Sequence, residues 1–389
     1  GAGLEVIDIG VVATPMLYYA VSKYELGGGV IVTASHNPGP DNGMKILRGD
    51  VALSGDEIQD LYRRASQEVR VEATGGSIRS ADILTPYIDE LSGDAKLGAR
   101  KLKIAVDAGN GMSGPCITAL LDKMGIDYVP LYCDPDGSFP NHHPDPTKAE
   151  NLKDLRATVK REQCDFGIGF DGDGDRIGVV DEDARILQGD RLLMIFARDL
   201  LKDEPGAKIV GEVKCSEVLF DRIEAWGGEA ILSRVGHSFI KKTLRDEGAL
   251  LAGEVSGHIF FKHRYYGFDD ATYAAMRLLE IASRMDENSP FSSLLADVEN
   301  PVSTPEIRMG CSDEIKFDVV ERVSTHFQKN HEVNALDGAR IRFEDGWGLV
   351  RASNTEPSLV LRFEAQSEES LAQYQETVTQ YVEQTINAL

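Results

Sequence analysis

The order of hydrophobic and polar positions divides most of the chain into short strands and longer helices. Apolar runs rich in β-branched residues alternate with segments whose apolar residues recur every three or four positions. Buried strands separated by amphipathic helices are typical of α/β domains. We expect strands at residues 29–33, 101–107, 165–170, 208–211 and 229–233, a strand pair within 253–261, and helices at 55–68, 148–161, 216–226 and 237–246.

This alternation recurs in blocks of domain size. We place three consecutive α/β domains at residues 1–98, 99–186 and 187–298. The first begins with a strand at residues 6–11 and a helix at 15–22 that have no preceding unit to pair with. We therefore expect the first domain to be N-terminally incomplete.

The last part of the chain, residues 299–389, follows a different pattern. Apolar runs at residues 339–344, 347–352 and 359–365 predict an antiparallel sheet, and Ser367 is suited to cap a helix that follows it. One face of that helix is apolar, with Leu371, Tyr374, Val378, Val382 and Ile386. The predicted fold is three mixed α/β domains followed by a smaller α+β domain.

Composition narrows the class of protein. With 42% hydrophobic residues, a chain of 389 residues can bury a core in each domain, which excludes disorder. Its formal charge of −23 does not suit binding to nucleic acid or to an anionic membrane, which depends on clustered Lys and Arg. No run approaches the ~18 apolar residues of a membrane span. The five cysteines lack C-x-x-C spacing, so we expect a cytoplasmic protein with reduced, buried thiols.

An acidic loop follows the strand expected at residues 165–170. Asp171, Asp173 and Asp175 alternate with glycines, so three carboxylates can converge on one hard cation. An EF-hand is excluded because Arg176 stands where its loop needs Gly. We expect Mg²⁺ shared with a phosphate oxygen, and the alternative is a solvated acidic turn.

A second candidate loop contains Ser35 directly after the strand at residues 29–33. Its neighbour is His36, and Lys45 follows ten residues later. A hydroxyl at a strand end beside these groups is suited to act as a nucleophile or phosphate carrier. Taken alone, the segment is equally typical of an ordinary turn.

A third loop joins the two strands expected within residues 253–261. Strand alternation would place Glu254, Ser256 and His258 on one face, where they could bind sugar hydroxyls. Three ordinary exposed strand residues are an equal alternative. Shortly before this loop, His237 begins a predicted helix that also carries Lys241 and Lys242.

The fourth loop joins two strands of the last domain and combines an Arg, hydroxyls and an amide. These donors suit a phosphate dianion, although the same residues also form ordinary turns. We expect Glu356 to face away from a bound phosphate. The candidate phosphate ligands are Arg351, Ser353, Asn354 and Thr355.

In this order, the four loops resemble those of the α-D-phosphohexomutases. The segments T-A-S-H-N-P, D-G-D-G-D-R, G-E-V-S-G-H and R-A-S-N-T-E-P are similar to the phosphoserine, magnesium, sugar and phosphate loops of that family. Residues 139–146, 213–215 and 249–270 resemble its bacterial phosphomannomutase/phosphoglucomutase branch. The resemblance implies a heart-shaped molecule with a central cleft and a C-terminal domain similar to the TATA-binding protein. Family members also carry a strand and an Arg well before the phosphoserine loop, and only 34 residues precede Ser35 here.

The resemblance also implies roles for individual residues. Ser35 would carry the phosphoryl group and, with Asp171, Asp173 and Asp175, bind one Mg²⁺. The remaining residues would serve acid–base catalysis (Lys45, His237), substrate or phosphate contact (His36, Arg176, Lys214), sugar hydroxyls (Glu254, Ser256, His258) and the non-reacting phosphate (Arg351, Ser353, Asn354, Thr355). Lys45 would need a lowered pKa to act as a base. We also expect these cations to make the cleft locally positive.

The implied activity is reversible interconversion of hexose 1-phosphate and hexose 6-phosphate, of mannose or glucose, with glucose 1,6-bisphosphate as intermediate and activator. The enzyme would work as a monomer on a small sugar phosphate. Three alternatives stay open: a glucosamine phosphate mutase of the same family, a Mg²⁺-dependent sugar phosphatase, and a sugar-phosphate sensor without catalysis.

Overall fold

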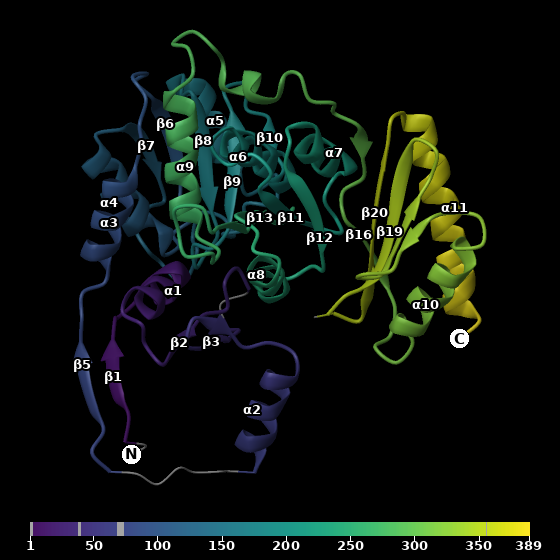
Figure 1. Ribbon diagram of the computed structural model, residues 1–389, viewed down its shortest axis with the longest axis horizontal. Helices are drawn as coiled ribbons and strands as arrows, with labels where there is room; N and C mark the ends of the chain where they lie inside the picture. Colours follow the sequence, from purple (N-terminus) through teal and green to yellow (C-terminus); the bar gives the residue numbers. More distant parts are fainter. Residues whose placement is uncertain (1–2, 38–39, 68–73, 355) are drawn as a thin grey trace.

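The computed structural model describes residues 3–37, 40–67, 74–354 and 356–389. Within these ranges the chain forms four units in series, three that mix helices with strands and a C-terminal antiparallel unit (Figure 1). This architecture confirms the predicted fold class. None of the helices in the described ranges is both long enough and apolar enough to cross a membrane.

The first unit contains two small sheets. β1 pairs with β5 in parallel, and β2, β3 and β4 form an antiparallel sheet. Its elements are β1 (Glu5–Asp8), α1 (Thr14–Lys23), β2 (Gly28–Val32), β3 (Met44–Arg48), β4 (Val51–Ala52), α2 (Asp56–Ser66) and β5 (Ser77–Ser80). α1 packs closely on β2, because a Cβ at Gly29 would lie only 2.8 Å from the side chains of Leu17 and Val21. The loop between β2 and β3 carries Ser35.

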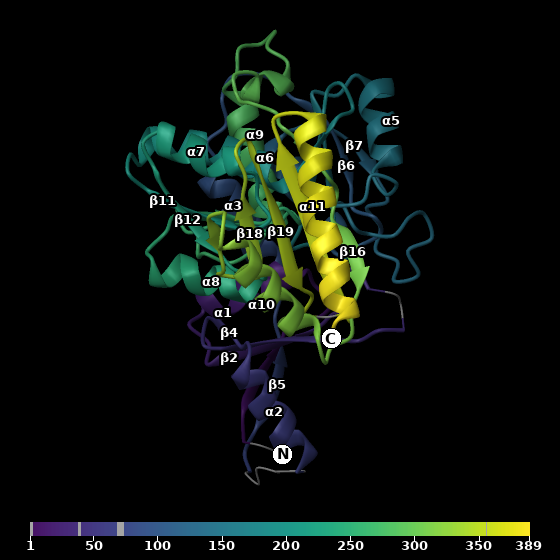
Figure 2. The same ribbon diagram turned by 90° about the vertical axis from the view of Figure 1, so that its right-hand side faces the viewer.

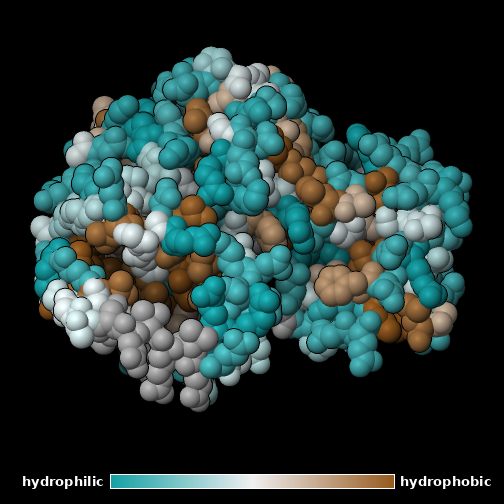
Figure 3. Space-filling view, turned by 60° about the horizontal axis from the view of Figure 1, so that its bottom comes forward, coloured by the Kyte–Doolittle hydropathy of each residue, from teal (hydrophilic) through white to brown (hydrophobic). Residues whose placement is uncertain are grey.

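The outer face of the β2–β3 pair is apolar and open. Val30, Val32 and Met44 are 56%, 64% and 67% exposed, and α2 has no buried residue. Figure 3, which looks onto this side of the molecule, shows apolar side chains gathered beside the grey residues. The first unit is therefore anchored mainly through α1, whose residues Thr14 to Val21 are buried.

The second unit has a mixed sheet in the order β10-β9-β8-β6-β7, in which β6, β7 and β8 are parallel. β8 and β9 are buried along their whole length, so the loop between them leaves the centre of the sheet. The elements are α3 (Leu84–Asp94), β6 (Lys103–Asp107), α4 (Ser113–Met124), β7 (Asp127–Leu131), α5 (Lys153–Glu162), β8 (Phe166–Phe170), β9 (Ile177–Asp181) and β10 (Ile186–Leu187).

The third unit has a four-stranded sheet in the order β12-β11-β13-β14, with only β14 antiparallel. Its elements are α6 (Gly189–Asp203), β11 (Lys208–Glu212), α7 (Glu217–Ala225), β12 (Glu229–Ser233), α8 (His237–Asp246), β13 (Leu251–Gly253), β14 (Ile259–Phe261), α9 (Ala271–Ser283) and the 3₁₀ helix η1 (Phe291–Leu295). α9 is buried on every side. One continuous apolar cluster joins α1, α3, α4, α6 and α9, so the first three units share a core.

The fourth unit is a six-stranded antiparallel sheet covered on one face by α10 and α11 (Figure 2). Its elements are β15 (Val302–Ser303), β16 (Ile307–Gly310), α10 (Lys316–Phe327), β17 (Val333–Asn334), β18 (Ala339–Arg342), β19 (Gly346–Ala352), β20 (Ser358–Ala365) and α11 (Glu368–Asn387). Ser367 caps α11 by accepting a hydrogen bond from the Ser370 N–H, as predicted. This unit has its own core and meets the third through a small cluster of Val213, Trp347 and Leu349.

Several predicted elements differ from the structure. The strand expected at residues 6–11 is Glu5–Asp8, because Gly10 takes a left-handed φ of 76° and turns the chain. The helix expected from residue 148 starts at Lys153, since residues 145–151 form successive turns that Asp145 and Lys148 close with backbone hydrogen bonds. The sequence pattern also missed α3, α6 and α9.

Candidate active site

Ser35 lies on a tight turn directly against the acidic loop. Its backbone φ is 54°, a left-handed conformation that the Thr33 hydroxyl supports by accepting the Ser35 N–H at 2.9 Å. The Ser35 hydroxyl donates to Oδ2 of Asp171 at 2.9 Å and lies 3.0 Å from Nδ1 of His36. The approach is close, because a Cβ at Gly172 would lie 2.4 Å from the Ser35 carbonyl oxygen. The hydroxyl is thus held at the edge of three carboxylates.

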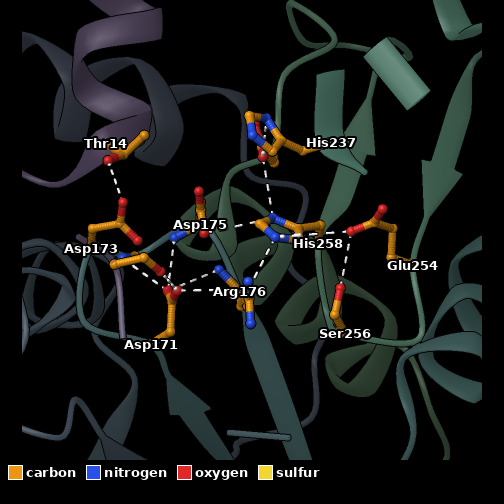
Figure 4. Close-up of polar contacts among 12 residues, drawn as sticks. Thr14, Asp171, Asp173, Asp175, Arg176, His237, Glu254, Ser256 and His258 are labelled. Atoms are coloured by element: carbon orange, nitrogen blue, oxygen red, sulfur yellow. Dashed lines mark hydrogen bonds and ion pairs between the residues drawn. The ribbon is translucent and has the colours of Figure 1, made fainter. Parts of the chain in front are cut away.

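The acidic loop is shaped by its own first carboxylate. Oδ1 of Asp171 accepts the backbone N–H groups of Gly174, Asp175 and Arg176 at 3.0, 3.0 and 3.1 Å. The loop therefore folds back, and oxygens of all three aspartates come within 4.8 Å of one another (Figure 4). The three carboxylates therefore converge, as the sequence predicts.

Asp173 is fixed by two side chains that sequence reasoning missed. Its Oδ2 accepts hydrogen bonds from the hydroxyls of Thr14 at 2.7 Å and Thr33 at 3.1 Å. Thr14 is the first residue of α1, so the first unit positions a carboxylate of the second. The contact joins residues 159 positions apart, and the local sequence carries no signal of it.

The donor set fits a divalent cation. All three carboxylates are buried, and burial together with Asp175 and Asp173 raises the pKa of Asp171 well above its usual range. Oδ1 of Asp173 and Oδ1 of Asp175 are buried without a hydrogen-bond partner among the described residues. Buried carboxylate oxygens that lack donors are suited to ligate a hard cation such as Mg²⁺.

The pKa of Lys45 is raised in this structure, whereas a proton acceptor near neutral pH would need a lowered pKa. Its ammonium bonds to Oδ2 of Asp173 at 2.7 Å and to Oδ2 of Asp175. Burial opposes its charge, but these two carboxylates outweigh burial and raise the pKa of Lys45 well above its usual range. In this arrangement Lys45 is a cation among the carboxylates, and the lowered pKa that a base would need is absent.

The sugar loop forms a turn, and not the extended strand that alternation predicts. The Gly257 N–H donates to the Glu254 carbonyl at 3.0 Å, which brings the three predicted side chains together on one side (Figure 4). The Ser256 hydroxyl donates to Oε2 of Glu254 at 3.0 Å, and that oxygen lies 3.9 Å from Nε2 of His258. Convergence of these residues therefore follows from the tight turn at Gly257, whose φ is 91°.

His258 and His36 are both connected to Arg176. Nε of Arg176 donates to Nε2 of His258 at 3.0 Å, and its Nη1 lies 3.5 Å from Nε2 of His36. Burial and the Arg176 charge lower the pKa of His36 to about 4, so its imidazole is neutral. One guanidinium thus links the sugar loop to the phosphoserine loop.

His237 begins α8 and stacks on His258, with ring centroids 5.9 Å apart. Burial, followed by the charge of Lys241, lowers the pKa of His237 to about 4. Nζ of Lys241 lies 3.4 Å from Nδ1 of His237 and 4.0 Å from the centre of the Tyr18 ring. His237 is therefore a neutral imidazole near pH 7, as a proton acceptor must be.

The phosphate loop lies between β19 and β20. Arg351 is buried, and its Nε and Nη2 lack hydrogen-bond partners among the described residues, a state that suits an anion. Ser353 is buried and Asn354 exposed, while Thr355 lies outside the described residues. Glu356 pairs with Arg308. Lys316, which sequence reasoning missed, supports the loop by donating to the Ser353 carbonyl at 2.7 Å.

The cations of the site are matched by carboxylates. Nζ of Lys214 lies 2.6 Å from Oε1 of Glu306, and Nη2 of Arg351 lies 3.3 Å from Oδ2 of Asp337. Lys45 has its two aspartates. An incoming phosphate must therefore compete with these carboxylates for the three cations. The expected positive charge of the cleft stays a prediction.

Backbone groups join the fourth unit to the third at the site. Oδ2 of Asp337 accepts the Val235 N–H at 2.9 Å, and Oε1 of Glu254 accepts the Gly236 N–H at 2.7 Å. Residues 235–237 thus lie between the phosphate loop and the sugar loop. All four loops that the sequence singled out belong to one connected group of contacts.

Protein-family models match four successive segments of the chain. They are described as phosphoglucomutase/phosphomannomutase alpha/beta/alpha domains I, II and III and the C-terminal domain, and they match residues 1–71, 85–185, 188–301 and 306–380. Together these segments include every candidate loop.

Individual proteins resemble the chain over most of its length. It is 46% identical to the phosphomannomutase/phosphoglucomutase of Pseudomonas aeruginosa, a match that covers 95% of the chain and 79% of that protein. It is 44% identical to the phosphoglucomutase of Neisseria gonorrhoeae, over 96% and 81%. A crystal structure of a phosphoglucomutase/phosphomannomutase family protein from Burkholderia thailandensis matches with a TM-score of 0.91 and 43% identity, over 99% and 84%.

Proposed function

The chain belongs to the phosphoglucomutase/phosphomannomutase family, and we propose that it interconverts hexose 1-phosphate and hexose 6-phosphate, of glucose, mannose or both, through a phosphorylated Ser35. The observation that carries the proposal is the contact of the Ser35 hydroxyl with Asp171, at the edge of three converging carboxylates. A serine held there can carry a phosphoryl group beside a bound cation. Family membership makes this chemistry an intramolecular phosphoryl transfer.

In the first step, the bond between phosphorus and Oγ of Ser35 breaks as a bond to a free sugar hydroxyl forms. The hydroxyl proton leaves to a base, and Oγ of Ser35 recovers a proton when it is released. Positioning and charge stabilisation supply most of the rate of such transfers. A Mg²⁺ ion held by Asp171, Asp173, Asp175 and Ser35 would neutralise charge on the transferring group.

The chain's own residues divide the remaining tasks. Arg176 is suited to contact the transferring phosphoryl group, because its guanidinium reaches His36 beside Ser35. His237, with its pKa near 4, is available as a neutral base, whereas Lys45 contributes positive charge.

The substrate would be held at two ends. The buried guanidinium of Arg351, whose Nε and Nη2 make no hydrogen bond among the described residues although Asp337 lies 3.3 Å from Nη2, would bind the phosphate that is not reacting, together with Ser353, Asn354 and Thr355 of the same loop. Glu254 and Ser256 would bind sugar hydroxyls, with His258 beside them and Lys214 nearby. Glucose 1,6-bisphosphate would form, turn around and return its other phosphate to Ser35, and added bisphosphate would restore an enzyme that has lost its phosphoryl group.

The proposal is tested by intact mass and by activity together. Wild-type protein treated with glucose 1,6-bisphosphate should gain the mass of one phosphoryl group, and Ser35→Ala should not. A coupled assay with the 1-phosphates of glucose, mannose and glucosamine then identifies the preferred sugar. Thr33→Ser is a matched control, because it keeps the hydroxyl that supports the Ser35 turn.

The alternatives predict other results. A phosphatase would release inorganic phosphate faster than it forms isomer, and a sensor would bind sugar phosphate without turnover. A phosphoryl adduct that persists in Ser35→Ala would refute the assignment of Ser35. We further propose that the protein acts in the cytoplasm as a monomer. Size-exclusion chromatography with light scattering would test the oligomeric state.

A further inference from the structure

One buried carboxylate outside the predicted site lies beside three basic side chains, two of which are predicted site residues. Asp269, between β14 and α9, is fully buried. Its oxygens lie 2.6 Å from Nζ of Lys241, 3.1 Å from Nδ1 of His258 and 3.9 Å from Nδ1 of His237. A carboxylate with this set of neighbours can orient several side chains at once.

The hydrogen bonds of His258 determine which of its nitrogens carries the proton. Arg176 can only donate, so Nε2 of His258 must be the acceptor of their 3.0 Å contact. Nδ1 therefore carries the proton of the neutral ring. It faces two carboxylates, Oδ2 of Asp269 at 3.1 Å and Oδ1 of Asp175 at 3.6 Å. Neither contact meets the geometry of a full hydrogen bond.

These two acceptors are not equivalent. Asp269 is the nearer acceptor, at 3.1 Å against 3.6 Å for Asp175. Asp175 is also one of the three converging aspartates that would hold a cation, whereas Asp269 is not part of that trio. Asp269 is therefore the acceptor suited to keep the Nδ1–H of His258 in place.

The hydrogen-bond donors and acceptors are arranged in the same way at the phosphoserine loop. Nη1 of Arg176 approaches Nε2 of His36 at 3.5 Å, so His36 also carries its proton on Nδ1, which faces the Ser35 oxygen at 3.0 Å. Ser35 in turn donates to Asp171. The contacts thus form a continuous series from Asp269 through His258, Arg176 and His36 to the hydroxyl of Ser35.

We propose that Asp269 is a positioning residue for phosphoryl transfer: it fixes the Nδ1–H tautomer of His258, which holds Arg176 and, through it, His36 against Ser35. The inference rests on the proposed mutase function. It assigns Asp269 no contact with substrate.

A purely structural ion pair with Lys241 is the competing explanation, and the neighbouring residue supplies a control for it. Asp270 is also buried and caps α9, and it accepts the hydroxyls of Tyr87 at 2.9 Å and Tyr265 at 2.7 Å. Its contacts are structural, and none reaches His258. Asp270→Asn therefore reports the cost of altering a buried carboxylate at the same place in the fold.

The direct readout is the ¹⁵N spectrum of histidine-labelled protein, with the His258 signals assigned by their loss in His258→Gln. Wild-type protein should show His258 as the Nδ1–H tautomer. Asp269→Asn can donate its amide to Nδ1, so it should shift His258 toward the Nε2–H tautomer. Asp270→Asn should leave the spectrum of His258 unchanged.

Kinetics supply the second readout. Asp269→Asn should lower kcat by on the order of 10²-fold, as expected for misplaced catalytic groups, and change KM by less than about threefold. Asp269→Glu should recover part of kcat, because the carboxylate remains. Asp270→Asn should lower thermal stability while kcat stays within about twofold of wild type.

The outcomes separate this inference from the proposed function. Absence of mutase activity in the wild-type protein would contradict the proposed function, whereas the tautomer measurement does not depend on activity. An Nε2–H tautomer of His258 in wild-type protein would overturn the role of Asp269, even if no variant folds. Equal losses of kcat in Asp269→Asn and Asp270→Asn would overturn it as well.

Discussion

The turn at Gly257 positions the sugar loop, and its replacement by alanine tests that role. Gly257 has a φ of 91°, and its carbonyl accepts the Ile177 N–H at 3.0 Å, which ties the turn to β9. A Cβ at this position would lie 2.4 Å from the Ile177 carbonyl oxygen. The turn must then move by roughly 1 Å to reach an ordinary separation of about 3.4 Å.

The size of the effect follows from two contributions. The positive φ costs about 1–2 kcal/mol for an L-residue, and relief of the clash costs about 1–3 kcal/mol more. A displacement of about 1 Å in groups that position a substrate lowers catalysis by about 10²-fold. We therefore expect Gly257→Ala to lose roughly 3 kcal/mol of stability and about 10²-fold in kcat/KM, with the Ser35 phosphoryl adduct still formed.

Gly248→Ala is the matched control. Gly248 also has a positive φ, 67°, but a Cβ at this position would have no atom of the described residues within 4 Å beyond its own chain neighbours, so only the backbone cost applies. Urea denaturation and the coupled mutase assay would be applied to both variants. Equal stability and equal kcat/KM in Gly257→Ala and Gly248→Ala would show that the turn at Gly257 does not position the sugar loop.

Three further predictions concern other parts of the site. Lys316→Met should raise KM by about tenfold or more with a smaller change in kcat, because a buried charged donor to the phosphate loop is lost; an unchanged KM would contradict this role. His237 should titrate in ¹⁵N spectra with a pKa of about 4. Since the unfolded chain binds more protons between that value and ~6.5, His237 should make the free energy of unfolding fall as pH decreases through this window, and His237→Gln should lessen the fall. Chelation of Mg²⁺ should abolish transfer but leave the mass of the Ser35 adduct unchanged, and activity that survives complete chelation would argue against the metal site.

Helices and strands with a periodic pattern of hydrophobic residues could be predicted from the sequence. β12 and α8 have the predicted bounds, and α11 has the predicted cap. α9 escaped prediction because it is buried on every side, so no polar face marks its helical period. Arg277 and Glu280 lie within α9 and pair with each other in the core. In the sequence, two charged residues do not indicate a fully buried helix.

The candidate loops could be found because each groups its chemistry within a few residues. The groups that hold those loops could not, because they come from distant parts of the chain. Thr14 reaches Asp173, and Asp337 reaches both Val235 and Arg351. The raised pKa of Lys45 was missed for the same reason, because the pKa of a side chain depends on which charges the fold brings near that side chain.

In the proposed mechanism, phosphate passes from Ser35 to the substrate and returns to Ser35. A single turnover can follow this transfer, with limiting glucose 1-phosphate whose phosphate carries ¹⁸O and enzyme phosphorylated with unlabelled bisphosphate. The mechanism predicts unlabelled glucose 6-phosphate and an ¹⁸O-labelled phosphoryl group on the peptide that contains Ser35. Labelled glucose 6-phosphate with no label on that peptide would contradict it.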